Sequence, residues 1–116
     1  MNDFTVVTKQ HTDRTVITVS GEMDLHTSPR LAQAATIIPL GGKALYLDLT
    51  DVSFMDSSGL NVLVRLRRRM RAEGGRLAIT GLGSQPTRLL KITDTYELFT
   101  TDAAAVGSGS GRRPSD

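Results

Sequence analysis

Residues 47–64, LDLTDVSFMDSSGLNVLV, decide the fold because they pass from a strand pattern to a helix pattern. Over residues 44–49, leucines alternate with other residues, which is typical of a strand with one buried face. Beyond Asp56 the apolar residues recur at helical spacing, at positions Leu60, Leu63, Leu66 and Met70. We therefore predict a strand over 44–49, a loop that contains Asp51 and Asp56, and a helix that ends near residue 71.

Two strands and a helix are predicted before this segment. Residues 4–10 and 15–20 are rich in β-branched side chains, and the polar residues between them can form the turn of a hairpin. The chain then leaves the sheet through residues 21–24. Ser28 followed by Pro29 predicts a helix start, with Ser28 as the N-cap. The apolar stripe of that helix consists of Leu31, Ala34, Ala35 and Ile38.

After the central helix, the pattern predicts a strand over residues 76–80 and a helix that begins at Ser84. The apolar residues of this helix are Leu89, Leu90 and Ile92. Residues 97–100 are interpreted as an edge strand, and residues 102–106 as about one helical turn. Strands that alternate with helices after a hairpin indicate an α/β fold, with a mixed four- to five-stranded sheet and helices packed against it.

Length and composition limit the function. With 116 residues the chain has room for one domain, which we place at residues 1–106, followed by a disordered Gly/Ser-rich tail at 107–116. The net charge of +2 is too small for a nucleic-acid-binding surface. The chain has no cysteines and two histidines, so we expect no metal site and no cofactor. No apolar stretch is long enough to span a membrane, and we expect a cytoplasmic protein.

The turn that begins the central helix holds the candidate functional residues Asp56, Ser57, Ser58 and Gly59. The first turn of a helix carries backbone N–H groups without partners and suits an anion such as phosphate. Serine hydroxyls there are within reach of a kinase, and Gly59 has no side chain to obstruct a partner. The simpler interpretation is that Ser57 or Ser58 only caps the helix.

Residues 54–60, FMDSSGL, after a strand that contains Asp-Leu closely resemble the phosphorylation segment of the STAS family of anti-sigma factor antagonists. Residues 21–24, GEMD, are similar to the Gly-Glu-hydrophobic-Asp element of that family. The order of elements matches over about residues 3–106. The short apolar segment at 103–106 departs from the family, whose last helix is usually longer.

The resemblance implies a switch. In the family, the second serine of this motif, here Ser58, is phosphorylated by the anti-sigma factor, a serine kinase with a histidine-kinase-like ATPase fold. The unmodified protein binds that kinase and frees the sigma factor, the phosphorylated form does not bind, and a PP2C-type phosphatase restores the serine. By the same resemblance, Asp24, Asp56, Ser57 and Gly59 are expected to belong to the partner-binding site. Asp24 has a simpler interpretation as a turn former.

Other functions remain open. A phospho-acceptor receiver needs clustered aspartates and a lysine after the last strand; Asp24, Asp48 and Asp56 are present, but the lysine is not, and we expect no enzyme. For Asp48 a hydrogen-bonding role within the sheet is the simpler interpretation. A STAS subunit of a transporter, lipid-trafficking or stress-sensing complex, without a switch, is the main alternative.

Overall fold

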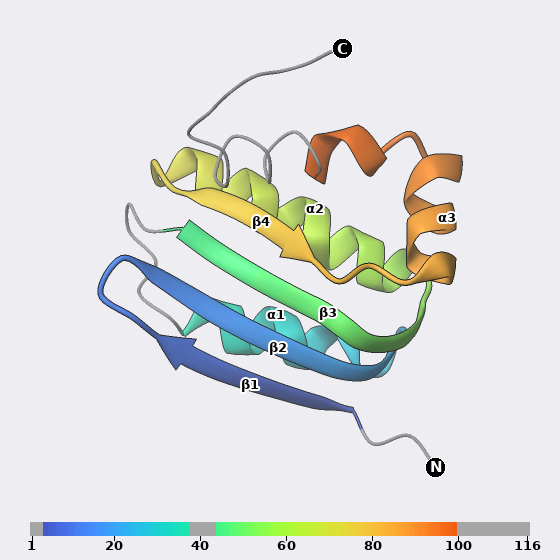
Figure 1. The fold of residues 1–116 in the computed structure, drawn as a ribbon, viewed down its shortest axis with the longest axis horizontal. Coiled ribbons are helices and arrows are strands. Elements are labelled where there is room, and N and C mark those ends of the chain that lie inside the picture. The colour runs from blue at the N-terminus through green and yellow to red at the C-terminus, as the bar shows by residue number, and fades with distance from the viewer. Residues whose placement is uncertain (1–3, 38–43, 100–116) are drawn as a thin grey trace.

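The structure is a computed structural model that describes residues 4–37 and 44–99. In it the predicted strands form one mixed sheet of four strands (Figure 1). The strands are β1 (Thr5–Gln10), β2 (Arg14–Met23), β3 (Ala44–Met55) and β4 (Arg76–Thr80). The helices are α1 (Ser28–Thr36), α2 (Ser57–Ala72) and α3 (Ser84–Ile92). The sheet order is β1-β2-β3-β4, with β1 antiparallel to β2 and the other pairs parallel. The predicted hairpin and the α/β class are confirmed.

The core lies on one face of the sheet. Ile17 and Val19 of β2 and alternate leucines of β3 are fully buried there, as the alternation predicted. Helices α1 and α2 both lie behind the sheet in the view of Figure 1 and cover this face. The predicted apolar side of α2 is buried: Leu60, Leu63, Leu66 and Met70. In α1, Leu31 and Ala35 are buried and Ala34 is partly exposed, whereas Ile38 lies outside the described residues.

Two strands are longer than the sequence predicted. The chain does not leave the sheet at residue 21, because β2 continues to Met23, and β3 continues through the predicted loop to Met55. The pairing between them extends to Met23 opposite Met55, with register shifts on both sides of Gly21. Gly21 has a φ of 102°, a conformation that favours glycine and that permits this irregularity without ending the strand.

Two predictions near the helices were wrong in detail. The N-cap of α1 is Thr27, and Ser28 is the first helical residue. Ile92, one of the apolar residues of α3, is 73% exposed at the end of that helix. Residues 96–99 are helical rather than strand, and Phe99 packs in the core. A run as short as ELFT has no period that distinguishes the two. Residues 102–106 and 107–116 lie outside the described residues.

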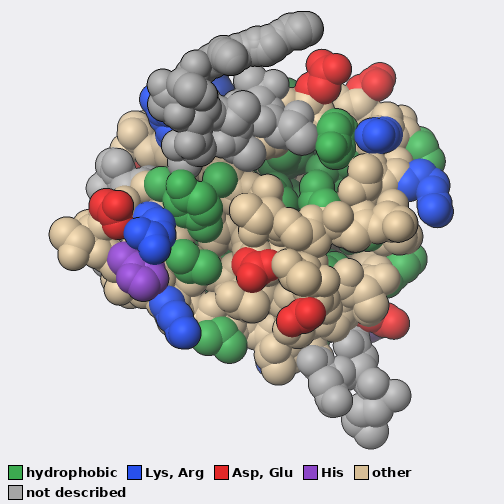
Figure 2. All heavy atoms as spheres, viewed as in Figure 1, with side chains coloured by type: hydrophobic (Ala, Val, Ile, Leu, Met, Phe, Trp, Pro, Cys, Tyr) green, Lys and Arg blue, Asp and Glu red, His purple; other side chains and the backbone are tan. Residues whose placement is uncertain are grey.

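The sheet face opposite α1 and α2 is turned toward the viewer in Figure 2. Its hydrophobic side chains lie in several small groups with acidic and basic side chains between them, where described residues are seen. Within residues 4–37 and 44–99, no helix has the length and apolar character that a membrane crossing requires. Among the described side chains in view, the apolar groups on this sheet face are thus interrupted by charged side chains (Figure 2).

The beginning of α2 lies very close to the ends of β2 and β3. A Cβ atom on Gly59 would lie 2.9 Å from Met23 Cβ and 2.9 Å from Met55 Cγ. Real Cβ atoms do not approach other carbon atoms so closely, so only glycine permits this packing. Gly59 is buried. The close approach fixes where the first turn of α2 stands relative to the two strand ends.

We expect Gly59→Ala to lower the free energy of unfolding by about 1–3 kcal/mol, because the added methyl group must displace two buried methionines. Urea unfolding followed by circular dichroism measures this. Gly83→Ala is the matched control, since a Cβ there meets only Pro86 Cδ at 3.9 Å, and it should cost less than about 1 kcal/mol. Equal losses in the two variants would contradict the steric explanation.

Candidate functional site

The candidate site forms where β2 and β3 end side by side. Because the two strands are parallel and Met23 is paired with Met55, the residues that follow them emerge at the same edge of the sheet. The backbone N–H of Asp56 donates to the carbonyl oxygen of Met23 over 3.0 Å. The structure therefore brings the turn that contains Asp24 and the start of α2 together, as the sequence predicted.

Asp56, rather than either serine, caps α2. Its Oδ1 accepts hydrogen bonds from the backbone N–H groups of Ser58, at 2.8 Å, and Gly59, at 3.3 Å. The interpretation of Ser57 or Ser58 as the cap is therefore wrong. Two of the free N–H groups of the first turn, which the sequence suggested for a phosphate, are already bound to the Asp56 carboxylate. This helix start is not a vacant anion site.

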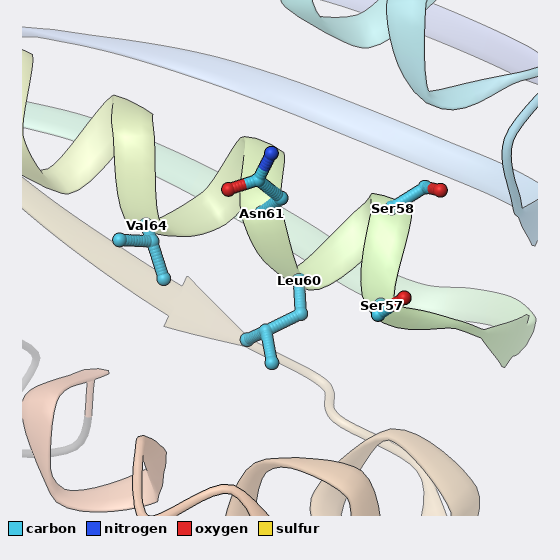
Figure 3. A pocket seen from close by; sticks show the side chains of 5 residues that line it. All are labelled: Ser57, Ser58, Leu60, Asn61 and Val64. Atoms are coloured by element: carbon cyan, nitrogen blue, oxygen red, sulfur yellow. The ribbon is translucent and has the colours of Figure 1, made fainter.

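The two serines are accessible. Ser57 is exposed and Ser58 is half-buried, and neither hydroxyl forms a hydrogen bond within the described part of the chain. Both line a shallow hollow of about 440 Å³ with Leu60, Asn61 and Val64 (Figure 3). In Figure 3, Asn61 lies on the upper side of α2, and Leu60 and Val64 lie on its lower side. The Ser58 hydroxyl is thus at a hollowed surface and is free to react.

Asp24 shapes the turn between β2 and α1. Its Oδ1 accepts hydrogen bonds from the backbone N–H of His26, at 2.9 Å, and of Thr27, at 3.0 Å, and its own N–H donates to Thr27 Oγ1. The hydrogen bond from the Thr27 N–H is the main reason that the pKa of the Asp24 carboxyl is below its usual value, although desolvation opposes this. The turn-forming role of Asp24 is confirmed, and its contact with a partner stays a prediction.

Gly59 has a packing role that the sequence did not suggest. It is buried against Met23 and Met55, so its small size serves the packing of α2 on the strand ends. Direct contact between Gly59 and a partner is not tested by this packing and stays a prediction.

Gln85 of α3, which no sequence pattern singled out, contacts the end of β3. Its Oε1 accepts from the N–H of Met55 at 2.8 Å, and its Nε2 donates to the carbonyl oxygen of Met55 at 2.8 Å. The side chain thereby pairs with the last residue of β3 as a neighbouring strand would, and holds α3 against the start of the site. Glutamine in a helix carries no sequence signal for such a contact, which depends on residues 30 positions apart.

Asp48, which the sequence placed within a strand, has hydrogen-bond partners of its own in the structure. The Asp48 carboxylate accepts from the Thr50 hydroxyl at 2.6 Å and the Thr50 N–H at 3.0 Å, and these hydrogen bonds lower its pKa. Asp48 is therefore engaged within β3, as the simpler interpretation held. Among the described residues, no three histidine, aspartate or glutamate side chains are grouped so that they could hold a metal ion.

Asp24→Ala should lower the melting temperature, because it leaves two N–H groups of the turn without their acceptor. Asp24→Asn keeps the Oδ1 acceptor, so its melting temperature should fall less than that of Asp24→Ala. Since the folded pKa is lowered, the ionised carboxylate stabilises the fold above the unfolded pKa of about 3.9, and this contribution is lost as the pH falls through the folded pKa. Melting curves of wild type and Asp24→Ala between pH 7 and pH 3 should therefore converge at acid pH. A constant difference would contradict the role of the carboxylate charge.

Comparisons with known proteins agree with this geometry. The chain is 36% identical over 100 residues to the anti-sigma-B factor antagonist of Listeria monocytogenes, covering 85% of this chain and 88% of the relative. It is 30% identical over 105 residues to the protein of the same name from Bacillus subtilis, covering 90% and 96%. A crystal structure of an anti-sigma factor antagonist from Mycobacterium paratuberculosis superimposes with a TM-score of 0.75 at 28% identity, covering 90% of this chain and 93% of the other.

The family model of the STAS domain matches residues 5–105, a span that contains every helix and strand described above. This span includes both strand ends that build the candidate site. The chain therefore belongs to the STAS domain family.

Proposed function

We propose that this chain is an anti-sigma factor antagonist that switches partners by phosphorylation of Ser58. The unphosphorylated form binds an anti-sigma factor that is a serine kinase, and the sigma factor is released. That kinase phosphorylates Ser58 and binding ends, and a PP2C-type phosphatase restores the hydroxyl. The relatives named anti-sigma-B factor antagonists, aligned over most of the chain, support the antagonist role.

The observation that carries the switch is the free hydroxyl of Ser58 beside a capped helix start. Asp56 satisfies the N–H groups of Ser58 and Gly59, so modification of Ser58 breaks no capping hydrogen bond. Ser58 is only half-buried and lines the hollow on α2. A phosphate can therefore be added and removed while the fold stays unchanged.

Charge explains how such a phosphate blocks binding. A phosphoserine carries about −1.5 to −2 charges at neutral pH. It would stand close to the Asp56 carboxylate, whose Oδ1 is 2.8 Å from the Ser58 nitrogen. A partner that covers this site must desolvate both negative groups, and one pair of unit charges at 4 Å costs about 4 kcal/mol near a protein surface. A penalty of about 3 kcal/mol already reduces affinity roughly a hundredfold.

Phosphorylation is tested by incubating the protein with each serine-kinase anti-sigma factor of the same genome and ATP. Mass spectrometry should then place one phosphate on Ser58. Ser57→Ala is the matched control and should still be modified, whereas Ser58→Ala should not. If no kinase modifies the chain, the non-switching STAS module of a transporter, lipid-trafficking or stress-sensing complex is favoured instead.

Ser58→Asp should weaken binding to that anti-sigma factor at least tenfold, and Ser58→Ala should bind like the wild type and be insensitive to ATP. Titration calorimetry with and without ATP gives both affinities. Both variants should melt near the wild-type temperature, because the Ser58 side chain is half-buried and its hydroxyl makes no hydrogen bond within the described residues. Equal affinities for the two variants would rule out the charge mechanism.

A further inference from the structure

A second groove lies on the other side of Ser58, between α1 and α2. Its volume is about 290 Å³, and its wall on the α1 side is formed by Leu25, Ser28, Pro29 and Ala32. Ser58 and Asn61 of α2 line both this groove and the hollow described above, so they form a ridge between two concave surfaces. A group attached to Ser58 therefore affects both surfaces at once.

The α1 wall of the groove is apolar and unusually accessible. Leu25, in the turn after β2, is 69% exposed although it directly follows the structured Asp24 turn. Pro29 and Ala32 continue the apolar wall along α1. Leu25, Pro29 and Ala32 thus line one side of the groove together, and a side chain held in a structured turn loses little entropy when a partner covers it.

A buried polar group also lines this groove. Ser28 is 2% exposed, and its Oγ has no hydrogen-bond partner among the described residues. Buried hydroxyls are nearly always hydrogen-bonded, so an unsatisfied one beside the groove leaves a polar atom whose partner a small shift of α1 could supply from the groove. This observation is independent of the serine motif on α2.

Arg65 gives the groove its charge. It lies on α2 two turns after Ser58, is exposed, and is the one charged side chain among the described residues that line the groove. Within residues 4–37 and 44–99, Arg65 forms no ion pair or hydrogen bond, in contrast to Arg69, which pairs with Glu73 and donates to the carbonyl oxygen of Ala35. The Arg65 guanidinium is therefore available to a carboxylate from outside.

We infer that the α1–α2 groove receives an apolar side chain of the anti-sigma factor, next to an acidic residue that pairs with Arg65. This inference rests on the proposed function and names the contact that gives it specificity. The volume of about 290 Å³ is at the lower limit of the roughly 300–1,000 Å³ of small-molecule sites, which favours one or two side chains over a free ligand. The single positive charge on the rim favours an acidic neighbour to that side chain.

The charge of this occupant fits the switch. An acidic group attracted by Arg65 lies along the same ridge that ends at Ser58. Phosphate on Ser58 then repels the acidic residue of the partner that Arg65 attracts. It also repels the neighbouring carboxylate of Asp56. The unmodified form thus presents only the positive charge of Arg65 along the groove, whereas the phosphorylated form adds a negative charge at the Ser58 end.

The test measures the affinity of the full chain for the anti-sigma factor that phosphorylates Ser58. Leu25→Asp and Arg65→Glu should each raise Kd at least tenfold with melting temperatures near that of the wild type. Ile92→Asp, at a residue 73% exposed at the end of α3, and Arg68→Glu, at an exposed arginine on the same helix, are matched controls and should change Kd less than twofold. The wild-type Kd should also rise with salt more steeply than that of Arg65→Glu.

The outcomes separate this inference from the function on which it rests. If Leu25→Asp and Arg65→Glu bind like the wild type while Ser58→Asp loses affinity, the groove is wrong and the switch stands. If the wild type binds no anti-sigma factor, both fail. If the two groove variants instead abolish self-association in sedimentation velocity and leave anti-sigma binding unchanged, the occupant is a second copy of this chain, and the inference is overturned.

Discussion

The parallel pairing of β2 with β3, continued as far as Met23 and Met55, positions every part of the candidate site. Parallel strands deliver the residues that follow them to one edge of the sheet, so Asp24 and Asp56 emerge next to each other although they are far apart in sequence. The hydrogen bond from the Asp56 N–H to the Met23 carbonyl extends this pairing by one more residue. Gly59 then allows α2 to start against both methionines. A change in this register would separate the two halves of the site.

Asp56 and Ser58 have different roles because both lie at the start of α2, beside the ends of β2 and β3. One carboxylate oxygen binds the N–H groups that a helix start leaves open, so the serine hydroxyl is not needed for stability. The same carboxylate puts a negative charge beside Ser58, the proposed site of phosphorylation. In the proposed switch the structural cap is therefore also an electrostatic component, and a phosphate would act through charge and desolvation rather than through a change of fold.

The surface around Ser58 is asymmetric. The hollow that Figure 3 shows is bordered by Leu60 and Val64 of α2 itself, whereas the groove on the other side of the ridge is bordered by the Asp24 turn and α1. Asp24 orders the turn that presents Leu25, and Arg65 supplies the charge on the opposite wall. In the proposed complex, stability and recognition are therefore coupled in this turn. Among STAS domains of one fold, such wall residues are the natural place for differences in partner choice.

Local patterns in the sequence were enough to predict the fold class and the family of the protein. The alternation of β2 and β3, the helical spacing of α2 and the motif around Ser58 each depend on neighbouring residues, and they were sufficient for the α/β class, the mixed sheet and the family. Periodicity was not sufficient where segments were short or irregular, as in residues 96–99, which are helical, and in the strand beyond Gly21.

Only the tertiary structure decided which side chain does what at the site. Whether Asp56 or a serine caps α2, why residue 59 is glycine, and that Gln85 hydrogen-bonds Met55 all depend on contacts between atoms that folding brings together. Capping by serine and by aspartate is equally compatible with the sequence, because both residue types are strong N-caps. The geometry of one helix start against two strand ends removes that ambiguity.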